Sequence, residues 1–565
     1  MSANNFAIAT GHPLATEAAS EMLRAGGNAI DAGVAAGLTL GVVHPELVSV
    51  AGVAPIILRN GKTGVVTSYD GVGVWPKAAN VNWFHDNFGD TVPEGILRTV
   101  VPAAPASWIR ALCEHGTMRF GDIAAPALRA ARNGFDVFPL LAEFIASRQK
   151  EYRRFASTAA IFMPNGRPPE VGETFVQSDL ADMLQIMIDA EANCPGDRLA
   201  GLAAARAAFY EGEIAKIITD FHAENGGLLT MEDMANYEVR EEKTYPVTFR
   251  GHEIHCCGAW CQGISMAETL AMFETAGPER AITKDGDIDR HFLIEVLKRV
   301  FADREAYITD PHFMEISPED LLDPTFIANR LASISATKSD PLPLAGKADG
   351  KKATPVRKTD VMPDYLRGSA DTSHVSIIDA DGNMFSATPS DPSADTQVIP
   401  GTGMSVSSRG SQSRAIPGHH NALAPGKRPR LTPNPILGLK DGKPWLVMGT
   451  PGGDVQVQAM MQVLIHMLDR GLALKDAIEA PRVATYAFPG SFAPHTVHPN
   501  KVLYEADLPE PVIAELKQLG HDIEAWPAST WKAGGVCVAL SDASGTLSAS
   551  ADQRRAGTAD VVNQN

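Results

Sequence analysis

The apolar positions of the chain recur with a helical period through its first third. Residues 13–26 form an amphipathic pattern that ends at a Gly-Gly pair, which predicts a helix with a glycine stop. An Ala-rich helix opens at Asn28, and the apolar run from Ala29 to Leu58 predicts a buried helix followed by strands. Further helices are expected over these segments: 106–114, 122–133, 178–191, 288–307 and 318–333.

The pattern changes to short strands after residue 371. Three pairs of apolar segments are joined by Asp/Gly turns, which predicts three β-hairpins: 375–378 with 384–388, 436–439 with 445–448, and 536–540 with 547–549. An amphipathic helix over 455–468 separates the second hairpin from the third. A helix-rich front and a hairpin-rich back predict an α+β fold in which helices cover stacked sheets.

Residues 337–371 lie between these two regions and have no apolar period. They are rich in Lys, Asp, Pro and Gly, so we expect an exposed loop. Unusually long loops in compact domains are typically disordered or functional, and we interpret this one as a processing region.

Composition narrows the class of protein. With 565 residues the chain exceeds one ordinary core, which suggests two to four domains. A net charge of −18 repels phosphate and anionic lipid, so we expect neither a nucleic acid nor a membrane as partner. Residues 1–7 have no basic region or apolar stretch, so no secretory signal is predicted and a cytoplasmic location is expected.

The six cysteines change this picture little. Without a signal they suggest reduced thiols. His255-Cys256-Cys257 with Cys261 lacks the CxxC spacing of a zinc site, and buried cysteines beside a strand are the better interpretation. We therefore expect no zinc site at these cysteines, and the reaction predicted below needs no metal and no cofactor.

Thr372 is the strongest candidate for chemistry, because it joins the polar segment to the first hairpin. A threonine hydroxyl is a weak nucleophile without a base. The α-amine of the same residue, with an ordinary pKa of about 7.7–8, is such a base once the Asp371–Thr372 bond is cut. An ordinary strand threonine is the alternative.

Residues 449–454, Gly-Thr-Pro-Gly-Gly-Asp, lie between a predicted strand and a predicted helix. The paired Gly452 and Gly453 leave backbone N–H groups open at a helix N-terminus, which suits an oxyanion hole. A phosphate cradle is an alternative, but the Lys of a P-loop is missing. A purely structural turn is the other.

The chain resembles the γ-glutamyltransferase family of N-terminal nucleophile hydrolases along nearly its whole length. The matching motifs follow in chain order: Gly26-Gly27-Asn28-Ala29-Ile30-Asp31-Ala32, Phe209-Tyr210-Glu211-Gly212, Gly226-Gly227, Asp233-Met234-Ala235-Asn236-Tyr237, Ala302-Asp303-Arg304, Asp310-Pro311, Thr372-Ser373-His374, Asp381-Gly382-Asn383, Gly452-Gly453, Ala480-Pro481-Arg482 and Asp552-Gln553-Arg554.

This resemblance implies a four-layer αββα sandwich and a precursor cut at Asp371–Thr372. Residues 1–371 would form the large subunit and 372–565 the small one, and the family allows a homodimer of such heterodimers. It also implies that Thr372 is the nucleophile and that Gly452 and Gly453 form the oxyanion hole. Ser390 stands where the family has a threonine that binds the nucleophile's amine and assists processing.

The specificity positions depart from the transferase pattern. Val72 stands in place of the arginine that holds the glutamyl carboxylate, and Gln412 in place of the aspartate that holds the ammonium. Leu431-Thr432 replaces a serine pair. Because lost charge-assisted anchors cost selectivity, this argues against γ-glutamyl recognition. Residues 409–429 instead resemble the transferase-like amidohydrolase branch, which includes oxamate amidohydrolase.

We name four candidate substrate-binding residues, Arg409, Ser373, Gln412 and Thr432. Arg409 is the candidate for a substrate carboxylate, with a solvated loop arginine as the alternative. His374 is assigned a structural role because strand neighbours alternate between faces. Asp303-Arg304 is interpreted as a structural ion pair.

The function we predict is a self-processing amidohydrolase of a small amide, acting through an acyl-enzyme on Thr372. A γ-glutamyl hydrolase or transpeptidase with altered anchors is one alternative. An unprocessed, non-catalytic binding protein of the same fold is the other.

Overall fold

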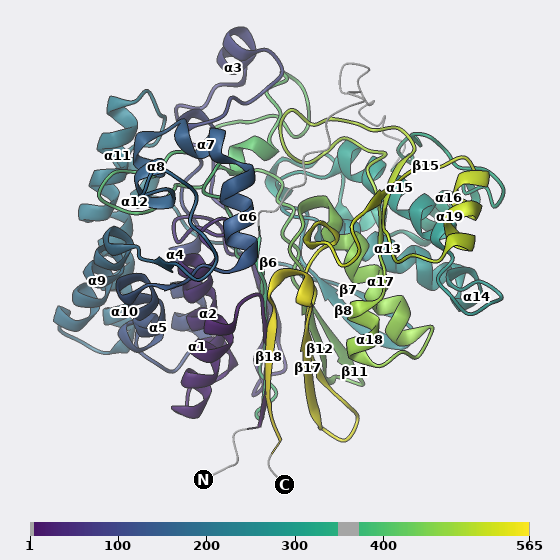
Figure 1. The fold of residues 1–565 in the computed structure, drawn as a ribbon, viewed down its shortest axis with the longest axis horizontal. Coiled ribbons are helices and arrows are strands. Elements are labelled where there is room, and N and C mark those ends of the chain that lie inside the picture. Colours follow the sequence, from purple (N-terminus) through teal and green to yellow (C-terminus); the bar gives the residue numbers. More distant parts are fainter. Residues whose placement is uncertain (1–4, 349–371, 564–565) are drawn as a thin grey trace.

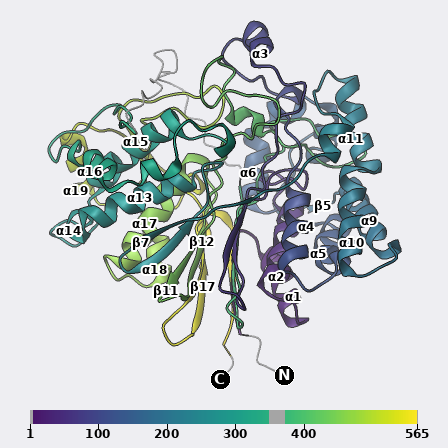
Figure 2. The ribbon, with the colours of Figure 1, turned by 180° about the vertical axis from the view of Figure 1, so that it is seen from behind.

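A computed structural model describes residues 5–348 and 372–563, and it consists of two β-sheets packed between two layers of helices (Figure 1). The view from behind shows the same four layers (Figure 2). The predicted αββα sandwich is therefore confirmed.

The first sheet brings both ends of the described chain together with the hairpin that follows Thr372. Its strands run in the order β18 (Thr558–Val562), β1 (Phe6–Thr10), β9 (Val375–Asp379), β10 (Met384–Ala387), β2 (Ile56–Arg59), β3 (Val66–Tyr69) and β6 (Glu241–Glu242). The second sheet runs in the order β17 (Leu547–Ala551), β16 (Cys537–Ser541), β12 (Lys443–Gly449), β11 (Ile436–Lys440), β8 (His252–Cys256) and β7 (Tyr245–Phe249). Smaller sheets pair β13 (Val483–Thr485), β14 (Lys501–Glu505) and β15 (Asp522–Trp526), and β4 (Phe135–Asp136) with β5 (Thr174–Phe175).

Each sheet is covered on its outer face by helices, which come from residues 13–235 for the first sheet and from residues 263–332 and 456–518 for the second (Figure 1). The first sheet is covered by helices among α1 (Pro13–Arg24), α2 (Ala29–Val43), α3 (Val81–Phe88), α4 (Ala104–His115), α5 (Phe120–Asn133), α6 (Pro139–Ser147), α7 (Gln149–Arg153), α8 (Ala156–Phe162), α9 (Ser178–Asn193), α10 (Arg198–Tyr210), α11 (Glu213–Glu224) and α12 (Met231–Ala235). The second is covered by helices among α13 (Gly263–Ala276), α14 (Pro278–Ala281), α15 (Arg290–Tyr307), α16 (Pro324–Ala332), α17 (Gln456–Leu468), α18 (Leu474–Glu479) and α19 (Glu510–Gln518).

The β9–β10 hairpin is buried on both faces, and its side chains alternate between two cores. Ile377 and Phe385 pack into the cluster under the first helical layer. Ile378 and Met384 pack into a separate cluster between the sheets, together with Val447. Since successive strand side chains point to opposite faces, every even-numbered residue of this hairpin faces the second sheet.

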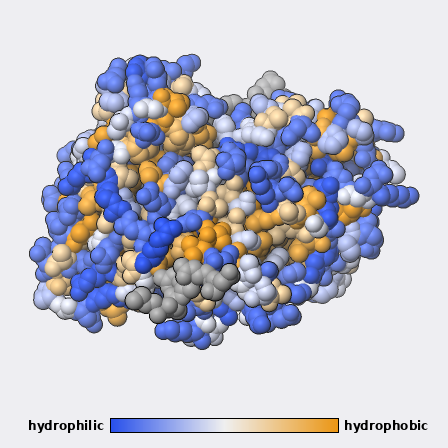
Figure 3. Space-filling view, turned by 60° about the horizontal axis from the view of Figure 1, so that its bottom comes forward, coloured by the Kyte–Doolittle hydropathy of each residue, from blue (hydrophilic) through white to orange (hydrophobic). Residues whose placement is uncertain are grey.

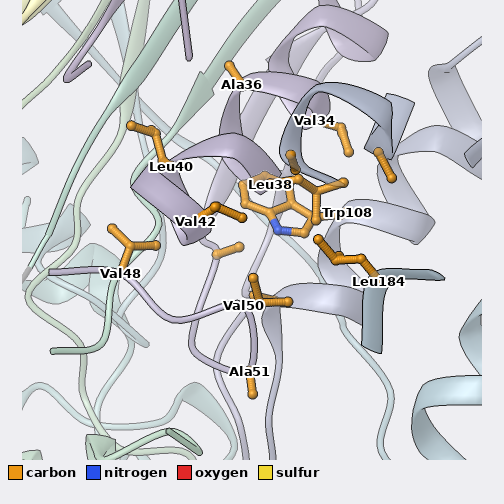
Figure 4. Packing of buried hydrophobic residues seen from close by; sticks show 14 of the residues in the cluster. Val34, Ala36, Leu38, Leu40, Val42, Val48, Val50, Ala51, Trp108 and Leu184 are labelled. Atoms are coloured by element: carbon orange, nitrogen blue, oxygen red, sulfur yellow. The ribbon is translucent and has the colours of Figure 1, made fainter. Parts of the chain in front are cut away.

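The first helical layer packs closely enough to require a glycine. Trp108 of α4 lies over α2 at Gly37, where a Cβ atom would come within 2.6 Å of the indole ring. Figure 4 shows Trp108 among apolar side chains that include Leu38 and Val50. The long apolar run 29–58 begins with a core helix, as predicted, but it contains a single strand, β2, where strands were expected.

The predicted hairpins and most predicted helices are confirmed, with shifts of a few residues at their ends. The single helix predicted over 318–333 is wrong: a 3₁₀ turn, Pro318–Leu321, precedes α16. Asp323 caps α16, and Pro324 lacks the N–H that a continuous helix would need.

The segment predicted as an exposed loop is irregular as far as residue 348, but it is not uniformly exposed. Ser339 and Ala348 are buried, and the Gly346 N–H donates to the Asp303 carboxylate at 2.5 Å. These contacts attach the segment to α15. Residues 349–371, including Asp371, lie outside the described residues.

No helix within the described ranges is long and apolar enough to cross a membrane. On the face seen in Figure 3, hydrophobic patches are interrupted by hydrophilic residues.

Candidate active site

Thr372 lies at the end of a ladder of polar side chains that faces the second sheet. In the register of β9 and β10, Thr372 pairs with Ser390 in a β-bridge. The pairing continues along the hairpin with the following residues, which we call the polar ladder: Thr372, His374 and Ser376 on one side, Ser390, Thr388 and Ser386 on the other. Ser376 and Ser386 donate across to backbone oxygens of Cys537 and Met448. The polar ladder therefore joins the two sheets.

The hydroxyl of Thr372 has a fixed partner. Its Oγ1 lies 2.8 Å from Ser390 Oγ, and both residues are fully buried. Ser390 is held in turn by backbone hydrogen bonds to Val53 of 3.0 and 3.3 Å. Because cross-strand partners share one face of a sheet, this contact follows from the hairpin register itself.

Ser390 Oγ also accepts a hydrogen bond from Arg409 Nη2. Arg409 is fully buried, and its Nε lies 3.3 Å from Asp391 Oδ1. Asp391 has a backbone φ of 117°, a conformation that costs energy for a residue with a side chain. The structure thus connects Thr372, Ser390, Arg409 and Asp391 through adjacent polar contacts.

The Asp391 carboxylate is held in place on its far side. It accepts hydrogen bonds from Ser407 Oγ at 2.7 Å and from Ser408 N and Oγ at 2.9 Å. Burial raises the pKa of Asp391, while Arg409 and these donors oppose that rise. The sequence-based interpretation missed Asp391; its place directly after Ser390 is the only local signal that could have marked it.

His374 is engaged at both ring nitrogens. Nδ1 lies 2.9 Å from Thr388 Oγ1 and Nε2 lies 2.8 Å from Ser376 Oγ. Burial lowers the pKa of His374 to about 3, so the ring is neutral at physiological pH. Its ring also packs on Gly449, where a Cβ atom would come within 2.2 Å. These contacts suit the structural role that the sequence suggested.

The loop with the two glycines begins beside this histidine ring, directly after Gly449. Gly452 has φ 122° and ψ 18°, and Gly453 has φ 57°, so both adopt conformations that favour glycine. No acceptor in the described part of the chain receives a hydrogen bond from either backbone N–H. The loop leads through a 3₁₀ turn into α17, so both N–H groups precede the N-terminus of a helix, where the helix dipole favours negative charge.

Asp454 anchors that loop. Its carboxylate accepts hydrogen bonds from Arg304 Nη1 at 2.5 Å and Gln262 Nε2 at 2.6 Å. Ser491 adds two more donors, its N at 2.8 Å and its Oγ at 2.7 Å. The loop carrying Gly452 and Gly453 is therefore held on a buried ion pair from α15.

The expected ion pair between Asp303 and Arg304 is wrong. Asp303 pairs with Arg330 at 2.7 Å, and Arg304 pairs with Asp454. Adjacent residues of a helix point in different directions and do not face each other. Both ion pairs are structural, but they connect α15 to different segments of the chain.

Ser373, a predicted substrate contact, points away from Thr372. A Cβ atom on Gly11 would come within 2.2 Å of Ser373 Oγ and 3.5 Å of His44. The hydroxyl is buried without a hydrogen-bond partner among the described residues. Strand alternation thus places Ser373 toward the first helical layer, on the opposite face from Thr372.

The other two candidates lie together. Gln412 Nε2 lies 3.2 Å from Thr432 Oγ1, and both side chains are fully buried. Val72 is also buried, in the apolar cluster that contains Leu431. The two positions that carry charges in the transferase pattern are here the aliphatic Val72 and the amide Gln412, and the serine pair of that pattern is here Leu431 and Thr432.

All six cysteines are in described residues and are free thiols, and Cys256, Cys257, Cys261 and Cys537 are buried. The metal-ligand types that converge in the described part of the chain are His291, Glu295 and His521. Glu295 is already paired with Lys298 and Arg299, whose charges oppose a bound cation.

Comparison with known proteins places these features in a family. The family profile described as gamma-glutamyltranspeptidase matches residues 15–562. The chain belongs to the gamma-glutamyltranspeptidase family. Its members and structural neighbours are hydrolases and transpeptidases of the N-terminal nucleophile class, so the chain is an enzyme of that class.

Individual members of the family are similar over almost their full length. The chain is 30% identical to the acylase ACY 1 proenzyme of Pseudomonas sp. strain SE83, covering 98% of this chain and 92% of the relative. It is 27% identical to the glutathione hydrolase proenzyme of Bacillus subtilis strain 168, covering 98% and 91%.

Solved structures agree with this assignment. The structure of LmbA2991HD matches with a TM-score of 0.92 and 30% identity, over all of this chain and 98% of the other. Cephalosporin acylase from Bacillus halodurans matches with a TM-score of 0.84 and 26% identity, over 100% and 97%. Within the gamma-glutamyltranspeptidase family, the chain is thus similar to acylases as well as to glutathione hydrolases.

Proposed function

We propose that this member of the gamma-glutamyltranspeptidase family is a self-processing amidohydrolase with Thr372 as its N-terminal nucleophile. The observation that carries the proposal is the 2.8 Å contact between Thr372 Oγ1 and Ser390 Oγ, at the end of the polar ladder that meets the glycine loop. Two fully buried hydroxyl groups add little to apolar packing, but the hydrogen bond between them orients Thr372 Oγ1 for nucleophilic attack.

The chemistry has two stages. In the precursor, Thr372 Oγ1 attacks the carbonyl carbon of Asp371, the peptide nitrogen leaves as the Thr372 amine, and water hydrolyses the resulting ester. In the mature enzyme, that amine accepts the Oγ1 proton while Oγ1 attacks the substrate amide. The leaving amine takes the proton, and water then cleaves the acyl-enzyme.

The remaining residues stabilise charge and geometry. The N–H groups of Gly452 and Gly453 are proposed to bind the oxyanion of the tetrahedral intermediate. Ser390 holds Thr372 Oγ1 during both stages. The neutral His374 joins the hairpin to Gly449, which keeps the nucleophile and the glycine loop at a constant separation.

The proposed substrate is a small amide whose acyl group is not γ-glutamyl. A γ-glutamyl group carries an ammonium and a carboxylate on one carbon, and each needs a charged partner in a buried site. Gln412, Thr432 and Val72 offer none. The relatives named as acylases support the same assignment.

A matched set of anilides tests this proposal. The γ-glutamyl, glutaryl and butyryl p-nitroanilides differ by removal of first the ammonium and then the carboxylate. We expect kcat/KM for glutaryl or butyryl to equal or exceed that for γ-glutamyl. A preference for γ-glutamyl of more than about 100-fold, or about 2.7 kcal/mol, would favour the γ-glutamyl hydrolase alternative.

A further inference from the structure

The sequence suggested Arg409 as a grip for a substrate carboxylate, but its surroundings point elsewhere. The side chain is fully buried, one of its Nη atoms donates to Ser390, and its Nε faces Asp391. Its guanidinium also lies over the Phe492 ring, 5.6 Å from the centroid. A guanidinium enclosed in this way is already bound on several sides.

For Thr372, the orientation of the Arg409–Asp391 ion pair matters more than the net charge of that pair. Asp391 lies on the Nε side and is turned toward Ser407 and Ser408. The Nη2 side faces Ser390, whose hydroxyl contacts Thr372. The positive end of the ion pair is therefore directed at the nucleophile and the negative end away from it.

We infer that Arg409 is a positioning residue that aims the Ser390 hydroxyl at Thr372 and keeps the mature Thr372 amine in its neutral, proton-accepting form. This rests on the proposed function. Because Ser390 Oγ accepts from Arg409, its own proton is available to Thr372 Oγ1. Arg409 is connected to Thr372 through one intervening hydroxyl, that of Ser390. A nearby cation disfavours a second cation, here the ammonium form of Thr372, and so lowers the pKa of the amine.

Other charged groups on the described elements around Thr372 do not supply this effect. His374, on the same strand, is buried and bonded at both ring nitrogens to hydroxyls. Asp454, on the glycine loop, is paired with Arg304. Arg409 and Asp391 are thus the pair that acts on the amine, and they act with opposite signs.

The pKa of the amine can be measured without knowing the substrate. An amine reacts with dinitrofluorobenzene only in its neutral form. The pH dependence of labelling at the Thr372 amine, read by mass spectrometry of the new N-terminal peptide, therefore gives the pKa of that amine. The amino terminus of the large subunit in the same sample is the internal reference.

Two substitutions are predicted to move this pKa in opposite directions. A nearby charge typically shifts a pKa by about 1–3, and Asp391 offsets part of the effect of Arg409, so Arg409→Gln should raise the pKa of the amine by about 1. Asp391→Asn leaves the cation uncompensated and should lower it. Arg330→Gln, which breaks a buried pair with Asp303 elsewhere, is the matched control and should leave it unchanged.

The possible results distinguish a failure of this inference from a failure of the proposed function. If Arg409→Gln does not mature, Asp391→Asn still tests the inference. Its expected effect is a lower pKa of the Thr372 amine, whereas a general loss of structure would raise that pKa toward its ordinary value. Shifts of the same sign in both variants, or no shift in a processed protein, overturn this inference alone. A wild-type protein without a free Thr372 amine overturns the proposed function as well.

Discussion

Replacing Ser390 with alanine is the most direct perturbation of the nucleophile's surroundings. The substitution removes the hydroxyl that lies 2.8 Å from Thr372 Oγ1 and takes an acceptor from the buried Arg409. A hydrogen bond in contact with a charged group contributes about 1.5–3 kcal/mol, and leaving a buried donor unpaired costs a similar amount. At 1.36 kcal/mol per factor of ten, kcat should fall by about 10- to 150-fold.

The assay is single-turnover release of p-nitroaniline from the best anilide, together with the rate of precursor cleavage. Both should slow, while KM changes little, because Ser390 acts on the nucleophile in our account rather than on the acyl group. Ser390→Thr keeps the hydroxyl and should retain most of the activity. A Ser390→Ala enzyme within about twofold of wild type in both rates would show that the Ser390 hydroxyl does not act on the nucleophile.

Two further predictions concern the glycine loop and a buried acid. Gly452→Ala places a side chain at φ 122°, so the loop must move its N–H groups, and kcat should fall by about 10²–10³ with little change in KM; an unchanged kcat in steady-state assays contradicts the oxyanion assignment. Glu46 has no hydrogen-bond partner among the described residues, and burial raises its pKa to about 8. The unfolded chain releases this proton near pH 4.5 while the folded chain keeps it until about pH 8, so stability is lost as pH rises through that window. Glu46→Gln should remove the loss, by up to about 4 kcal/mol between pH 5 and pH 8. Thermal unfolding midpoints that show the same pH dependence in both proteins would contradict it.

The parts of the fold encoded in local pattern were predictable. The β9–β10, β11–β12 and β16–β17 hairpins follow from Asp/Gly turns between apolar segments, and the register of the first one places Thr372 opposite Ser390. The insertion of β1 between β9 and β18 was not predictable in this way. It pairs segments from the two ends of the chain, and no local signal specifies such partners.

The same limit applies to the candidate site. Thr372 and the two glycines could be selected from the sequence because their residue types suit the proposed chemistry. The partners of the charged residues could not, because they depend on packing between distant elements. Arg304 contacts Asp454 across the helix–loop interface, and Arg409 turns back to Asp391. Ser373 carried the right chemistry for a substrate contact, yet strand alternation directs it to the other face.

Denaturing mass spectrometry of the purified wild type beside Thr372→Ala tests self-processing directly. We expect two wild-type chains, one ending at Asp371 and one beginning at Thr372, whose masses add to 60.2 kDa plus one water. Thr372→Ala should remain a single chain of the full mass. An intact wild type, or cleavage of both proteins at the same bond, would contradict self-processing by Thr372.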